Sequence, residues 1–159
     1  MKLAKQVLLV AVVLATQMPA MAQVEKVAMR TTGISCGVCA AVSEVYLRRL
    51  PAVDKITISL SKEAVMISYK PGAVFQPAEL REALKKSEVG VAQFQISARG
   101  RVQEQAGKQY FIAGKDKFVL VSSPAAPQLP AGGEIAVEGI VDDKAAPMEL
   151  KILTAKALK

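Results

Sequence analysis

The stretch Gly33–Ala40 reads Gly-Ile-Ser-Cys-Gly-Val-Cys-Ala, and two residues separate its cysteines, Cys36 and Cys39. Alternation of apolar and polar residues before it, over 24–32, predicts a β-strand. After it, 38–50 predicts a helix whose inward face carries Val42, Tyr46 and Leu50, with Leu47 alongside. The cysteine pair is therefore expected in the loop between a strand and the start of a helix.

The patterns that follow predict a second unit of the same kind. Alternation predicts strands over 53–60, 64–69 and 91–98. Pro77, well suited to a first helical position, predicts a helix that ends near Lys86. The order is β-α-β followed by β-α-β, which predicts an α+β fold, a ferredoxin-like sandwich with one antiparallel sheet and both helices on one of its faces.

The position of the cysteine pair has chemical consequences. A helix N-terminus carries partial positive charge and free N–H groups, and both favour thiolate, the form that binds metal. Cys36 and Cys39 are the only cysteines, and histidine is absent, which excludes histidine-based catalysis and histidine-containing zinc sites. Two soft sulfurs favour a metal of low coordination number, Cu(I) or Hg(II), whereas zinc usually takes four ligands. The methionines after the leader lie in strand patterns and are expected in the core or on the sheet surface rather than as ligands: Met29, Met66 and Met148.

In motif and in element order, residues 24–98 resemble the heavy-metal-associated (HMA) domain family, to which copper chaperones and periplasmic mercury-binding proteins belong. The family pattern is Gly-Met-Thr/Ser-Cys-x-x-Cys, then a helix, then a Gly-Val that enters the second strand. Here the motif is Gly33–Cys39, and Pro51-Ala52-Val53 stands at the second place. The resemblance implies a ferredoxin-like fold and a site in which Cys36 and Cys39 are the metal ligands.

Three positions depart from the family pattern. Ile34 replaces the usual Met, which is a conservative change in the core, and Ala52 replaces Gly. The loop before the last strand usually carries a Tyr, Phe or Lys that shields the metal or balances its charge. Here this loop is Glu-Val-Gly-Val over 88–91, with Val91 as the residue expected to exclude water. The last departure bears on how readily the ion would be transferred.

Residues 99–159 have a different pattern, in which no sustained helical period is present. A stretch rich in Pro, Ala and Gly, 123–133, predicts a loop. Short alternating segments predict a small all-β domain, with an OB-like barrel as one arrangement. Such a domain must protect its strand edges, and docking on the open sheet face of the first domain is one way to do so. The predicted strands are 100–105, 109–113, 117–122, 134–141 and 148–154.

The N-terminal residues, 1–22, have the features of a secretory signal peptide. Lys2 and Lys5 precede a short apolar run, and Ala20-Met21-Ala22 forms a small-x-small end. The run is shorter than the roughly 20 apolar residues that a membrane-spanning helix needs. We therefore expect cleavage after Ala22 and a periplasmic location, with an uncleaved anchor as the alternative. No second long apolar run follows, so the mature chain is not expected to span a membrane.

The distribution of the cations and the scarcity of aromatic residues argue against nucleic acid as a partner. The formal charge is +7, of which Lys2 and Lys5 contribute two, so residues 23–159 carry +5. The cations are spread along the chain, and the Arg48-Arg49 and Lys85-Lys86 pairs are expected on solvated helix surfaces. Aromatic residues make up only 4% and Trp is absent, so no basic surface with stacking rings is visible. The sequence leaves the oligomeric state open.

The predicted domains are therefore a signal peptide at 1–22, an HMA-like domain at 23–98 and a small β domain at 99–159. The predicted function is that of an exported binding protein, not an enzyme, that captures one Cu(I) or Hg(II) ion and hands it on. The resemblance implies a metal transporter or another metal-carrying protein as the partner. Two alternatives remain open: a thiol-disulfide redox protein, or a partner-binding module in which Cys36 and Cys39 form a structural disulfide.

Overall fold

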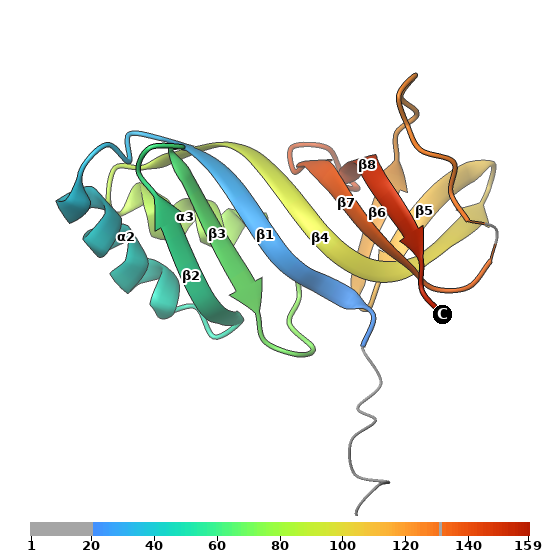
Figure 1. Ribbon diagram of the computed structural model, residues 1–159, viewed down its shortest axis with the longest axis horizontal. Helices are drawn as coiled ribbons and strands as arrows, with labels where there is room; N and C mark the ends of the chain where they lie inside the picture. Colours follow the sequence, from blue (N-terminus) through green and yellow to red (C-terminus); the bar gives the residue numbers. More distant parts are fainter. Residues whose placement is uncertain (1–20, 131) are drawn as a thin grey trace, which may run out of the picture.

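The computed structural model describes residues 21–130 and 132–159 (Figure 1). The predicted signal peptide therefore lies outside the described residues, except for its last two positions. Within these residues, two helices and eight strands follow one another. They are β1 (Gln23–Thr32), α2 (Gly37–Arg48), β2 (Val53–Ser59), β3 (Ala64–Tyr69), α3 (Pro77–Lys85), β4 (Gly90–Gln105), β5 (Lys108–Ala113), β6 (Asp116–Leu120), β7 (Ile135–Asp142) and β8 (Glu149–Ala157).

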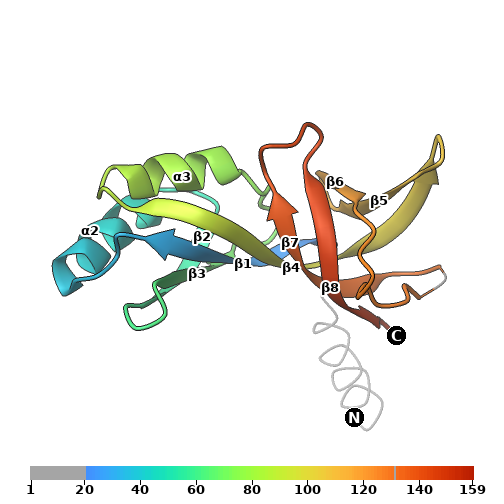
Figure 2. The same cartoon turned by 90° about the horizontal axis from the view of Figure 1, so that it is seen from above.

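The N-terminal sandwich consists of β1, α2, β2, β3, α3 and the first half of β4. Its strands pair in the order β2-β3-β1-β4, and every pair is antiparallel. Figure 2 shows α2 and α3 on the same side of this sheet. This is the ferredoxin-like α+β arrangement that the sequence predicts.

Alternation along the strands explains which face the helices cover. Val27 and Met29 of β1 are fully buried, whereas Ala28 between them is not, since successive side chains point to opposite faces. The buried residues of α3, among them Leu80 and Leu84, belong to the same hydrophobic cluster as these two side chains. In α2 the buried residues are Ser43 and Leu47. The predicted inward position of Val42 was wrong. Val42 is 38% exposed, and the next residue along the helix, Ser43, faces the sheet instead.

β4 is a single strand of 16 residues, and this corrects the prediction of separate strands over 91–98 and 100–105. The predicted domain boundary between 98 and 99 lies inside it. β7 pairs with β4 from Phe94 to Gly100, and β5 pairs with it from Arg101 onward. Gly100 lies where the neighbour of β4 changes. A Cβ at this position would overlap the Ile112 carbonyl of β5, so the close approach of the two strands requires a glycine. The predicted strand over 100–105 began at this glycine, whereas the strand in the structure runs through it and uses it to admit a close neighbour.

The C-terminal residues close a five-stranded ring with β4, and we use that term for β4–β8. The strands pair in the order β4-β5-β6-β8-β7, and β7 pairs back with β4. The strands after β4 thus return to it in a ring whose β6–β8 side is joined by two residue pairs alone, whereas the OB-type assignment stays a prediction. The ring extends the sheet sideways and does not cover the open face of the sandwich, where Met66 is 49% exposed. The docking on that face predicted above was therefore wrong.

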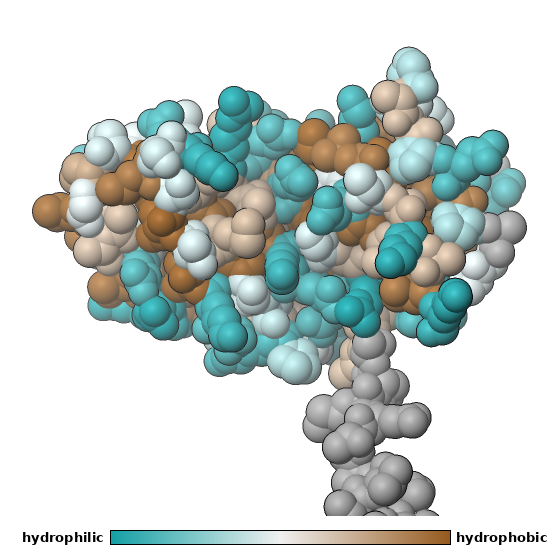
Figure 3. All heavy atoms as spheres, in the orientation of Figure 1, coloured by the Kyte–Doolittle hydropathy of each residue, from teal (hydrophilic) through white to brown (hydrophobic). Residues whose placement is uncertain are grey.

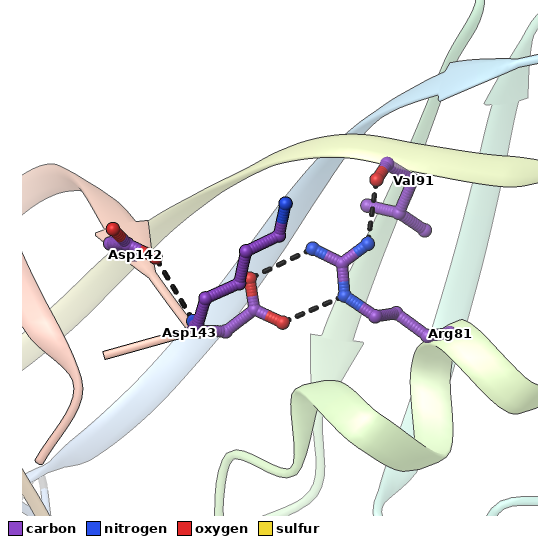
Figure 4. A network of polar contacts seen from close by, with 5 residues as sticks. Arg81, Val91, Asp142 and Asp143 are labelled. Carbon is purple, nitrogen blue, oxygen red and sulfur yellow. Dashed lines mark hydrogen bonds and ion pairs between the residues drawn. The ribbon is translucent and has the colours of Figure 1, made fainter. Parts of the chain in front are cut away.

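Phe75 joins the cores of the sandwich and the ring. Its ring centroid lies 5.7 Å from that of Phe94 and 6.1 Å from that of Phe118. Buried residues of both parts consequently form one continuous hydrophobic cluster. A polar link lies beside it, where the guanidinium of Arg81 in α3 donates two hydrogen bonds to the carboxylate of Asp143, of 2.7 and 2.8 Å, and a third to the Val91 carbonyl (Figure 4).

The surface of the molecule is mixed in polarity. Figure 3 shows hydrophilic and hydrophobic residues interspersed over the open sheet face, and a hydrophobic protrusion at the end where α2 begins. No helix within 21–130 and 132–159 has the length and apolar character that crossing a membrane would require.

Candidate metal-binding site

The loop between β1 and α2 is held in place by two neighbouring residues. Gly33 has a φ of +91°, a conformation that residues with a side chain rarely adopt. A Cβ on Gly33 would lie 3.2 Å from the carbonyl oxygen of Glu88, so this loop packs closely against the loop that joins α3 to β4. Ile34 is fully buried and anchors the loop in the sandwich core. The residues that follow Ile34 are consequently presented at the surface.

Cys36 is the N-cap residue of α2. Its backbone is extended, with φ −137° and ψ 156°, and its Sγ accepts a hydrogen bond of 3.2 Å from the Cys39 N–H. Its carbonyl accepts the Ala40 N–H at 3.0 Å, which begins the hydrogen-bond pattern of the helix. The prediction that the cysteine pair lies where a strand passes into a helix is therefore confirmed.

The sulfur atoms of Cys36 and Cys39 are adjacent and form a disulfide, with a Cα–Cα distance of 5.3 Å. Cys36 is exposed and Cys39 is half-buried. Among the described residues, no three side chains of the His, Cys, Asp or Glu type lie close enough together to hold a metal ion. A site here would therefore use two sulfurs and no further side chain of those types. The assignment of Cys36 and Cys39 as metal ligands stays a prediction.

The loop after α3 forms the second side of the site. Ser87 Oγ donates to the Leu84 carbonyl at 2.8 Å, and it lies 2.7 Å from Ser43 Oγ on α2. Glu88 has a φ of +60°, and Val89 is buried at 2% exposure. The apolar residue that seals this loop is thus Val89, whereas Val91, named in the sequence analysis, is half-buried in β4.

Cationic side chains near the ends of the helices lie over Tyr46. The Lys86 amino group is 5.7 Å from the ring centroid, and the Arg49 guanidinium carbon is 5.2 Å from it. Both cations are solvent-exposed, as the sequence predicts for the Arg48-Arg49 and Lys85-Lys86 pairs. They lie toward the C-terminal end of α2, whereas the cysteines are at its N-terminal end.

An exposed apolar stripe runs along α2 from the cysteine pair, and the sequence analysis missed it. Its members are exposed residues at positions i, i+3, i+4 and i+7 of the helix, where they share a face. Val38 is 74% exposed and Val45 is 51% exposed. The spacing of these residues shows that they share a helix face. Only the burial of Ser43 and Leu47 shows that this face points away from the sheet. The stripe consists of Val38, Ala41, Val42 and Val45.

Comparisons with known proteins give matches among solved structures alone. No protein-family model matches the chain, and no curated protein matches it. The CopZ metallochaperone matches 42% of this chain and 98% of its own, at 19% identity and a TM-score of 0.39. The yeast copper transporter domain Ccc2A matches 43% of this chain and 94% of its own, at 20% identity and a TM-score of 0.37.

A longer match is the water-soluble region of the P-type ATPase CopA from Bacillus subtilis. It covers 54% of this chain and 55% of that chain, at 27% identity and a TM-score of 0.41. The first two names describe a metallochaperone and a copper transporter domain, and in all three matches the likeness is limited to part of this chain. We base the fold on the strand order described above rather than on these matches.

Proposed function

We propose that this chain captures one soft metal ion, Cu(I) or Hg(II), between Cys36 and Cys39 and passes it to a partner. The observation that supports this most is the convergence of two sulfurs at the exposed N-terminus of α2, with the Cys39 N–H directed at Cys36 Sγ. Thiolates suit soft cations, and a site with two sulfurs suits ions that accept two ligands.

Capture requires that the disulfide is reduced first. A dithiol reductant supplies two electrons and two protons, so the sulfur–sulfur bond of Cys36 and Cys39 breaks and two thiols form while the reductant becomes a disulfide. Loss of both thiol protons on binding leaves two thiolates around one cation. With Cu(I) the complex carries one negative charge, which the N–H groups and dipole at the start of α2 stabilise.

Release would proceed from the more exposed sulfur. Cys36 is exposed and Cys39 is half-buried, so an incoming thiolate reaches the ion most easily on the Cys36 side. The incoming thiolate forms a three-sulfur intermediate, Cys36 then leaves, and Cys39 leaves when a second thiolate arrives. No bond of a substrate is made or cleaved, so the role is binding and transfer rather than catalysis.

The partner in this proposal is a metal transporter or another metal-carrying protein. The apolar stripe begins at Val38, next to the cysteines, and supplies a surface against which a partner packs while the ion moves between thiolates. Export to the periplasm through the signal peptide at 1–22 belongs to the same proposal.

A second candidate function is thiol-disulfide exchange, and the disulfide between Cys36 and Cys39 favours it. An exposed disulfide whose sulfur receives an N–H at a helix N-terminus is suited to attack by a substrate thiolate. Under this alternative the reduced protein should accelerate insulin reduction well beyond an equal concentration of free dithiol. A rate equal to that of free dithiol removes this candidate.

A metal titration tests the first proposal. Residues 23–159, reduced and kept from oxygen, should bind one Cu(I) or Hg(II) ion per chain in native mass spectrometry. The variant C36S/C39S should bind none, because hydroxyl groups are poor ligands for soft cations. As a matched control, Met66→Leu removes an exposed soft sulfur elsewhere and should keep the stoichiometry. If C36S/C39S binds as much metal as the wild type, the proposal is wrong.

A further inference from the structure

The outer edge of β8 is largely without a strand neighbour. On one side β8 pairs with β7 along its whole length, from Glu149 to Ala157. On the other side the described residues give it two pairs with β6, Val119 with Glu149 and Leu120 with Leu150. The last backbone hydrogen bond across that side runs from the Val121 N–H to the Leu150 carbonyl, at 3.0 Å. From Lys151 onward, the backbone groups on this side face the segment that follows β6.

That segment lies beside β8 without pairing with it. Figure 2 shows the chain after β6 passing beside β8. Pro124, Pro127 and Pro130 lack a backbone N–H and cannot donate to a neighbouring strand. The backbone hydrogen bond found within the described part of this segment joins Ala126 to Ser123, at 2.9 Å. The free edge of β8 is therefore adjacent to a segment that is poorly suited to occupy it.

A hollow of about 320 Å³ opens between this segment and the edge. Six of the eight residues that line it have apolar side chains, among them the buried Ile152, although polar atoms make up more of its exposed surface. Gln109 and Ser122 add polar groups at the rim. A volume of this size accommodates one or two apolar side chains. The main apolar walls are Leu120, Pro127, Leu129 and Ile152.

The outward side chains of β8 are cationic with one apolar residue between them. Lys151 and Lys156 are exposed, and Leu153 is 39% exposed. The carboxylates on the paired strands β7 and β8 are Glu138, opposite Thr154, and the paired Asp142 and Glu149 at the start of β8. Asp142 and Glu149 line a second hollow together with Lys151, whereas β8 itself carries no carboxylate between Lys151 and Ala157. A strand added at this edge would thus place its outward side chains next to positive charge.

We propose that the edge of β8 from Lys151 to Ala157 binds an extended segment of a partner protein in which apolar and acidic residues alternate. Backbone groups of the segment pair with the free edge, as in other cases of β-strand addition. Since neighbouring side chains of a strand point to opposite faces, one set enters the hollow beside Ile152 and the other set meets Lys151 and Lys156. This inference rests on the ring alone and is independent of the proposed metal site.

A binding measurement with a designed probe tests the proposal. The probe is a fluorescent seven-residue peptide that alternates valine and glutamate, titrated with residues 23–159 at low and high salt. We expect saturable binding that weakens as salt rises, because salt screens the lysine–glutamate attraction. The same peptide, N-methylated at alternate residues to block strand pairing, should bind at least about tenfold more weakly.

Paired charge-reversal variants locate the binding site. Lys151→Glu with Lys156→Glu should lower the affinity at least about fivefold. Lys26→Glu with Lys55→Glu changes the same net charge on the open sheet face and should leave the affinity unchanged. Circular dichroism establishes that each variant is folded. Equal affinity for the N-methylated peptide, or loss of binding in K26E/K55E alone, overturns the proposal, as does the absence of binding to the wild type.

Discussion

Asp116 accepts the backbone N–H of Phe75 with both carboxylate oxygens, at 3.2 and 3.0 Å, although 41 positions separate the two residues. Asp116 begins β6 of the five-stranded ring, and Phe75 precedes α3 of the N-terminal sandwich. Asp116 as a whole residue is 5% exposed. Burial raises the pKa of Asp116 to about 6, and the hydrogen bond from Phe75 lowers it in part. The contact thus joins the two parts while holding a carboxylate that resists ionisation.

Asp116 should make the protein less stable at neutral pH than in mild acid. The pKa of Asp116 in the folded protein is raised above the ordinary 3.8. The stabilisation that Asp116 contributes is therefore complete below pH 3.8 and is lost as the pH rises through about 6. Between these two pH values the wild type should lose about 1 to 3 kcal/mol of its free energy of unfolding through Asp116, and Asp116→Asn should not show this loss. Urea denaturation from about pH 4 to pH 7 measures it. The exposed Asp54→Asn serves as control, and an unchanged profile in D116N would contradict the prediction.

The ion pair of Arg81 and Asp143 should contribute more than an exposed one. Its side chains are 33% and 11% exposed, whereas those of Arg48 and Glu44 are 61% and 40% exposed. A double-mutant cycle with Arg81→Ala and Asp143→Ala should give a coupling of about 1 kcal/mol or more, and the Arg48–Glu44 cycle less than about 0.5. Equal coupling energies in the two cycles would contradict the larger contribution expected of the Arg81–Asp143 pair.

The same pair has its own pH dependence. The hydrogen bond from Arg81 lowers the pKa of Asp143, so its stabilisation is present above the ordinary carboxyl value and is lost as pH falls through the lowered one. The Arg81–Asp143 coupling should therefore shrink in strong acid. A coupling that stays constant down to about pH 2 would be inconsistent with this assignment.

Gly33→Ala should destabilise the site loop. The φ of +91° disfavours any residue with a Cβ, and that Cβ would press on the Glu88 carbonyl at 3.2 Å. We expect a loss of about 1 to 3 kcal/mol in the free energy of unfolding. Gly37→Ala is the matched control, since a Cβ there meets no atom within 4 Å. The prediction does not hold if both variants melt at the wild-type temperature.

Gly100→Ala should weaken the junction of the sandwich and the ring. The added methyl group would overlap the Ile112 carbonyl and touch the Phe111 ring, and backbone atoms cannot move aside without disturbing the pairing of β4 with β5. A cost of about 2 kcal/mol or more is expected in denaturant titrations. Ser97→Ala, on the half-exposed side of the same strand, should cost less than about 0.5 kcal/mol. Similar costs for both would refute the role given to Gly100.

The sequence predicted local structure well where one face of an element is buried. The alternation around Val27 and Met29 gave both the strand and its buried side, because burial selects the residues of one face. The division of β4 between the predicted strands 91–98 and 100–105 was wrong, since a change in sequence pattern does not show whether the strand itself ends. The closure of β7 on β4 depends on partners far apart in the chain, which no local pattern contains.

The candidate site was predicted in part. The position of Cys36 at the start of a helix follows from the pattern on either side of it. The packing of Gly33 on Glu88 was missed, because it joins two loops distant in sequence. The disulfide could not be chosen over two thiolates, since the spacing of Cys36 and Cys39 suits both.

Because β4 belongs to both the sandwich and the ring, the chain cannot be cut between the two parts without removing strand pairs from one of them. A fragment that ended at Ala98 would keep most of the cysteine-bearing sandwich, yet from Phe94 to Ala98 it would bare the side of β4 that β7 covers. Unprotected sheet margins stick to one another. Limited proteolysis should consequently spare this strand until the whole molecule unfolds.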